Sequence, residues 1–180
     1  MGSCGSCDSF GVILGVMMKR TKSGWPEFDK DCLDEFWTMA VSFDKKMKDL
    51  MYIKDHIDFF KKLTKDVLDL NSSVTVRINR SQYAFYDGLD IGPFCSFAFF
   101  RSNFSLNPLR LRPEQVKDLG CEIKSFDSKI YRMGGSFYVR FYNWDQKDLS
   151  NALEAAKRSF LVKEKVGPSA FFQDLKKVKI

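Results

Sequence analysis

The sequence has very little of the material from which hydrolytic and metal-dependent sites are built. It has one histidine among 180 residues, His56, so any Cys–His or Ser–His catalytic pair would have to use it. His56 lies at the edge of an apolar helical stripe, where we expect a boundary residue rather than a general base. Cys4 and Cys7 have the spacing of half a zinc site, but no second close cysteine pair follows. We therefore predict no metal site and no cofactor, and we expect a binding protein rather than an enzyme.

Long apolar runs and an export signal are also absent from the sequence. No stretch approaches the ~18 consecutive apolar residues of a transmembrane helix. The N-terminus lacks the charged segment and apolar segment of a secretory signal. An odd number of cysteines, five, fits reduced thiols better than a disulfide framework. These absences predict a cytoplasmic protein with no transmembrane segment.

Aromatic residues and positive charge are plentiful. The chain is 44% hydrophobic and contains 18 phenylalanines, which predicts a core filled by rings. Its net charge of +6 permits attraction to nucleic acid, to anionic lipid or to an acidic protein, and it selects none of them. The partner therefore has to be inferred from particular residues.

The order of the sequence patterns predicts a single α+β domain over residues 10–180, after a flexible leader over 1–9. Apolar residues recur with helical spacing over 29–70 and again over 145–178. Between them, residues 74–142 alternate as short strands whose connections are too short for parallel crossovers. We expect a mostly antiparallel sheet packed by the N-terminal and C-terminal helices.

Two segments of the sheet region carry more specific expectations. The run Phe94–Arg101 has bulky apolar side chains on both faces, so it is predicted to be a central strand with neither face exposed to solvent. The run Phe104–Leu111 contains Pro108, which lacks an N–H donor and is expected to confine the strand to an edge or to break it. A reversal is expected at Gly134–Gly135.

The strand over 136–142 supplies a candidate binding surface. Its alternation leaves Tyr138, Arg140 and Tyr142 on the face opposite the core, and Arg77 lies on the wetter face of the strand over 74–78. Two rings and a guanidinium on one face could stack unpaired bases, which predicts binding of single-stranded nucleic acid. Two alternatives stay open: a protein partner that uses exposed aromatic residues, and burial of this face under the helix over 29–70.

Within this strand, Gly135, Tyr138, Val139 and Phe141 resemble part of the third-strand motif of the RNA recognition motif family. The resemblance implies a sheet that binds RNA, over roughly residues 94–166. The sequence departs from the motif where Gly134 replaces a basic residue and where Ser136 and Phe137 stand in place of an aromatic and a small residue. Membership of the family is therefore not inferred.

An enzymatic alternative rests on Glu122 and Lys124, two residues apart on a predicted strand. This pair resembles the ExK half of the PD-(D/E)xK nucleases, in which carboxylates bind Mg²⁺ and a lysine assists the attacking water. Asp90 or Asp87 would be the second carboxylate, and Glu35 could join them. The Pro–Asp pair of these nucleases is missing, and the alternation is that of any amphipathic strand.

A phosphatase-like spacing, C-x5-R, joins Cys95 to Arg101. A phosphate cradle needs small residues whose N–H groups converge on the anion, and the intervening Ser-Phe-Ala-Phe-Phe has three rings instead. A buried strand is the favoured interpretation of these residues.

The leader has a second interpretation as a lipidation signal. Residues 1–6 match the M-G-x-x-x-[ST] pattern for myristoylation of Gly2, and Cys4 and Cys7 could carry a palmitoyl chain. Two acyl chains give the stable anchoring that one does not, so the alternative prediction is an adaptor held at a membrane surface.

Overall fold

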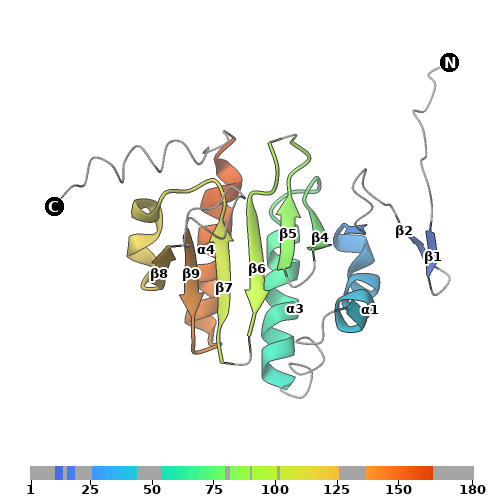
Figure 1. Ribbon diagram of the computed structural model, residues 1–180, viewed down its shortest axis with the longest axis horizontal. Coiled ribbons are helices and arrows are strands. Elements are labelled where there is room, and N and C mark those ends of the chain that lie inside the picture. The colour runs from blue at the N-terminus through green and yellow to red at the C-terminus, as the bar shows by residue number, and fades with distance from the viewer. Residues whose placement is uncertain are drawn as a thin grey trace.

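The described residues form a seven-stranded antiparallel sheet with helices on one face (Figure 1). The computed structural model describes residues 11–13, 16–18, 26–43, 54–79, 82–89, 91–100, 102–125 and 137–163. In order across the sheet the strands are β3 (Glu27–Phe28), β4 (Thr75–Asn79), β5 (Gln82–Tyr86), β6 (Cys95–Phe99), β7 (Phe104–Pro108), β9 (Phe137–Phe141) and β8 (Glu122–Ser125). Two further strands, β1 (Gly11–Ile13) and β2 (Val16–Met18), pair only with each other. The predicted α+β class is confirmed.

The helices begin and end close to their sequence signals. The predicted stripe over 29–70 contains a 3₁₀ turn η1 (Lys30–Cys32), helix α1 (Leu33–Phe43) and helix α3 (Lys54–Leu68), and residues 44–53 lie outside the described part. Helix α4 (Gln146–Leu161) begins where the Asp145 carboxylate accepts a hydrogen bond from the Asp148 amide at 2.8 Å. The 3₁₀ helix η2 (Pro113–Leu119) begins at a proline and ends at Gly120, the usual positions of these two residues at helix ends.

Helices α3 and α4 cover the same face of the sheet, and Figure 1 shows both behind it. From α3, the rings of Phe59 and Phe60 lie 5.0 Å from Phe104 and 5.1 Å from Tyr83. Helix α1 lies at the β3 end and is joined to the same core by Phe36, whose ring is 5.7 Å from Tyr83. None of the described helices lies on the opposite face. Helices α1 and α3 therefore do not cover Tyr138, and residues 44–53 of the predicted helical segment lie outside the described part.

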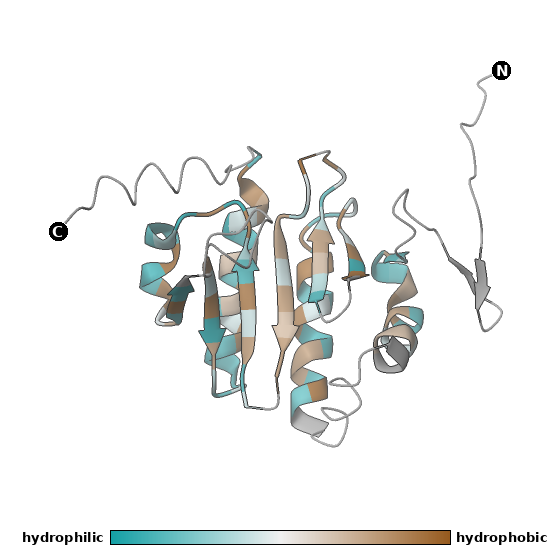
Figure 2. Cartoon of the chain, in the orientation of Figure 1, coloured by the Kyte–Doolittle hydropathy of each residue, from teal (hydrophilic) through white to brown (hydrophobic). Residues whose placement is uncertain are grey.

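Strand β6 is the fourth of the seven strands, as predicted, but its faces differ from expectation. Cys95, Phe97 and Phe99 are buried toward the helices. Phe94 precedes β6 and breaks the alternation, because its ring packs 5.4 Å from Phe160 of α4. Only Ser96 and Ala98 of β6 remain on the helix-free side, so β6 itself contributes no aromatic ring to that side. In Figure 2, the residues of β6 are mostly hydrophobic or neutral. Strands β8 and β9 contain hydrophilic residues as well.

The expectation for Pro108 is also corrected by the structure. Strand β7 lies between β6 and β9 and is neither an edge strand nor broken. Pro108 is its last residue, opposite Cys95, so its missing N–H removes no bond from the middle of the ladder. The expected reversal at Gly134–Gly135 lies outside the described residues.

No helix in the described segments has the length and apolar character required to span a membrane.

Candidate binding face of the sheet

The helix-free face is defined by side chains that alternate with the buried ones along each strand. Register places Arg77 opposite Ala84, Ala84 opposite Ser96, and Ser96 opposite Asn107. A neighbouring row runs from Ala98 through Ser105 and Arg140 to Glu122. The helix-free face includes Glu27, Thr75, Arg77, Gln82, Ala84, Tyr86, Ser96, Ala98, Ser105, Asn107, Glu122, Lys124, Tyr138 and Arg140.

The centre and the ends of the helix-free face differ in size and exposure. At the centre the side chains are small, and Ser96 and Asn107 are only 3% and 8% exposed and joined by a hydrogen bond of 3.1 Å. Arginines and tyrosines stand at the ends, and just beyond β9 Tyr142 is 49% exposed. A partner can therefore be reached mainly by the larger side chains at the two ends.

At the β9 end, Arg140 and Tyr138 form an arginine-over-tyrosine pair. The Arg140 guanidinium carbon lies 5.2 Å from the Tyr138 ring centroid, and Arg140 Nη2 donates a 3.0 Å hydrogen bond to the Tyr138 hydroxyl. A hydrogen bond with Tyr142 is the largest of the causes that raise the pKa of Arg140. The guanidinium is thus oriented mainly by the hydroxyls of Tyr138 and Tyr142, and it keeps its positive charge.

The carboxylate nearest this end is already engaged by other groups. Lys124 Nζ lies 2.6 Å from Glu122 Oε1, and the Tyr142 hydroxyl donates to Glu122 Oε2 at 2.5 Å. These two hydrogen bonds, from Lys124 first, lower the pKa of Glu122, and Glu122 raises the pKa of Lys124 in return. One negative and two positive charges leave a net charge of +1 on Glu122, Lys124 and Arg140 together.

At the β4 end, a second arginine-over-tyrosine pair joins adjacent strands. The Arg77 guanidinium carbon lies 3.8 Å from the centroid of the Tyr86 ring. Arg77 Nη2 is 3.2 Å from both carboxylate oxygens of Glu27, and Thr75 Oγ1 donates to Glu27 Oε1 at 2.5 Å. Charge at this end is therefore balanced within the protein, unlike at the β9 end.

The structure brings some of the predicted binding residues together and separates others. Tyr138, Arg140 and Tyr142 are neighbours, with Phe137, Val139 and Phe141 buried beneath them, as the alternation predicted. Arg77 shares the helix-free face but lies four strand spacings away, about 19 Å across the sheet. Tyr86 and Glu27 were missed: Tyr86 could have been found from the hairpin register that pairs it with Thr75. Glu27 carries no local signal, because it is 50 residues from Arg77 in sequence.

The residues of the nuclease alternative do not converge within the described segments. Glu122 and Lys124 lie on the edge strand β8, whereas Glu35 lies on α1 beside β3 at the opposite edge. Asp87 is buried against Arg110, and Asp90 lies outside the described residues. Among the described residues, no group of three His, Cys, Asp or Glu side chains could hold a metal ion.

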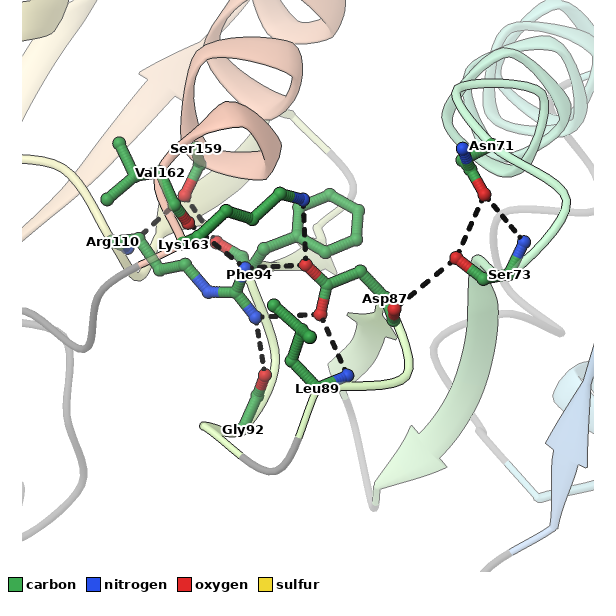
Figure 3. Close-up of polar contacts among 10 residues, drawn as sticks. All are labelled: Asn71, Ser73, Asp87, Leu89, Gly92, Phe94, Arg110, Ser159, Val162 and Lys163. Atoms are coloured by element: carbon green, nitrogen blue, oxygen red, sulfur yellow. Dashed lines mark hydrogen bonds and ion pairs between the residues drawn. The ribbon is translucent and has the colours of Figure 1, made fainter.

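A buried polar cluster on the helix side ties α4 to the sheet (Figure 3). Arg110 donates to both oxygens of Asp87, at 2.7 and 3.0 Å, and to the carbonyl oxygen of Gly92 at 2.9 Å. Lys163 adds a third donor to Asp87 at 3.2 Å. Burial alone raises the pKa of Asp87, but the hydrogen bonds from Arg110 and Lys163 outweigh burial and lower it to about 2. With Asp87 and Arg110 only 1% and 2% exposed, this cluster is structural.

The remaining candidate residues fall in the core or outside the described segments. Cys95 is fully buried, and burial raises the pKa of its thiol, the opposite of what a nucleophilic thiolate requires. His56 is half-buried and stacks on Trp144, with ring centroids 4.2 Å apart. Arg101 and the lipidation residues Gly2, Cys4 and Cys7 lie outside the described residues.

Comparisons of the chain with protein-family models, with curated proteins and with solved structures find no match. The function therefore has to be argued from the helix-free face itself.

Proposed function

We propose that this protein is a non-enzymatic binding protein that holds single-stranded nucleic acid on the helix-free face of its sheet. The observation that carries the proposal is the presence of two arginine-over-tyrosine pairs on that face, one on β9 and one across β4 and β5. Unpaired bases stack on tyrosine rings and on guanidinium planes, and phosphates pair with the same cations. A single strand fits this chemistry because its bases are free to stack.

Charge at the β9 end supports an anionic partner. Arg140 is bonded to phenolic hydroxyls, and Glu122 is held by Lys124, so one positive charge remains there for a phosphate. Tyr142 adds a ring that is 49% exposed beside this charge. An acidic protein could use the same charge, but the half-buried ring of Tyr138 and the exposed ring of Tyr142 beside a guanidinium also match the stacked bases and the phosphates of a single strand.

Binding of a fluorescein-labelled oligothymidylate, followed by anisotropy at several salt concentrations, tests the proposal. Arg140→Ala should weaken binding and make its salt dependence shallower by about 0.7 in log–log slope, because one fewer counterion-releasing contact remains. Tyr138→Ala should weaken binding with the slope nearly unchanged, since a ring releases no counterion.

Lys157→Ala is the matched control for charge, because it removes one cation from the exposed side of α4. It should change neither affinity nor slope beyond a small long-range effect. If the wild-type protein retains no single-stranded DNA or RNA at low salt, the proposal fails. A protein partner for the helix-free face would then be the better hypothesis.

A further inference from the structure

We infer that Arg77 and Tyr86 form a second stacking point for the same single strand, so that the ligand crosses the sheet and contacts both ends of the helix-free face. This inference rests on the proposed function and specifies its ligand. The Arg77 guanidinium is held over the Tyr86 ring at 3.8 Å and is bonded to Glu27, so the pair is ordered before any ligand arrives. A base can stack on such a preordered pair with little loss of side-chain entropy.

The sheet geometry sets the length of strand that both ends require. Strands β4 and β9 are separated by β5, β6 and β7, which makes four spacings of about 4.8 Å. Arg77 lies in the register row of Asn107 and Arg140 in that of Ser105, two residues along β7. The backbone positions of Arg77 and Arg140 are therefore about 20 Å apart. A stacked strand advances about 3.4 Å per nucleotide, so about six nucleotides span this distance, and an extended strand needs fewer.

The two ends differ in their electrostatics, which gives them separate signatures. Glu27 contacts Arg77 directly and cancels its charge, whereas Arg140 keeps its charge because Lys124 engages Glu122. The β4 end should therefore contribute mainly stacking, and the β9 end both stacking and salt-dependent attraction. Glu27 also limits how strongly Arg77 can attract a phosphate.

A length series of labelled oligothymidylates, dT2, dT4, dT6, dT8 and dT12, tests the inference by fluorescence anisotropy. Wild-type affinity should rise with length up to about six nucleotides and change little beyond that. Tyr86→Ala should weaken binding of dT8 roughly 5- to 150-fold, the value of one stacked base, and should flatten the length dependence. Tyr86→Phe keeps the ring and should bind as the wild type does. Glu27→Gln should bind more tightly, with a steeper salt dependence, because Arg77 is then free to pair with a phosphate.

The outcomes separate this inference from the proposed function. If Tyr86→Ala and Glu27→Gln both bind dT8 as the wild type does while Arg140→Ala weakens it, the second stacking point is refuted and the proposed function stands. If the wild-type protein binds no oligonucleotide of any length, the proposed function fails and the inference fails with it. If Tyr86→Ala does not fold, the wild-type length series and the Glu27→Gln variant still test the second stacking point, because neither removes an aromatic ring.

Discussion

Replacing Asp87 by asparagine should destabilise the protein strongly, because it leaves the buried Arg110 charge without its counter-ion. The pKa of Asp87 falls from an ordinary 3.8 to about 2 in the folded protein. A difference of this size corresponds to stability on the order of 2–3 kcal/mol. Removing one partner of a buried ion pair costs about 3–5 kcal/mol, so Asp87→Asn should lower the free energy of unfolding by about 2–5 kcal/mol at pH 7. Urea denaturation followed by circular dichroism measures the change.

The dependence on pH has a definite sign. Because the folded pKa lies below the unfolded one, the contribution of Asp87 is complete above about pH 4 and is lost as pH falls toward 2. Asp87→Asn should lack this part of the acid sensitivity. Lys163→Ala is the control: Lys163 is 51% exposed and touches the same carboxylate, so its loss should cost at most about 1 kcal/mol.

A double variant distinguishes a coupled pair from two independent contacts. Asp87→Leu with Arg110→Met removes both charges, and it should be less destabilising than the sum of the two single changes. The reasoning is refuted if Asp87→Asn unfolds within 1 kcal/mol of the wild type, or if the double variant is simply additive.

Two further predictions concern Gly120 and Glu122. Gly120 follows η2 with a φ of 62°, and a Cβ added there would meet no atom within 4 Å. Gly120→Ala should therefore lower the free energy of unfolding by about 1 kcal/mol through backbone strain alone, as measured by urea denaturation. An unchanged free energy of unfolding would contradict this prediction. Because the Glu122 carboxylate is occupied by Lys124 and Tyr142, we expect no degradation of labelled DNA or RNA on adding Mg²⁺; degradation that Glu122→Ala abolishes would establish the nuclease alternative instead.

Local periodicity in the sequence was sufficient for most of the secondary structure. The helical spacing of apolar residues over 145–178 predicted α4, and the same spacing over 29–70 predicted α1 and α3. Alternation along 136–142 placed Tyr138 and Arg140 opposite the buried residues of β9. These features depend on neighbours within a few residues, so a single strand or helix reveals them.

Strand pairing and the choice of covered face could not be read from the same local patterns. Pro108 ends an inner strand, which depends on β9 pairing with β7 more than thirty residues away in sequence. Phe94 departs from strand alternation because Phe160 of α4 draws its ring toward the helices. In both cases a distant element offers packing that outweighs the local preference.

The sequence alone determined the α+β class, the order of helices and strands, and the side of β9 on which the tyrosines and Arg140 lie. Each of these follows from the periodic spacing of apolar residues along the chain. Only the tertiary structure decided that this side is free of the described helices, and that Arg77 and Tyr86 share it at the other end. It also decided that Asp87 meets Arg110 in the core and that Glu27 meets Arg77. Contacts between residues far apart in the chain form only when distant strands pair and the helices pack against the sheet. No local sequence pattern therefore predicts them.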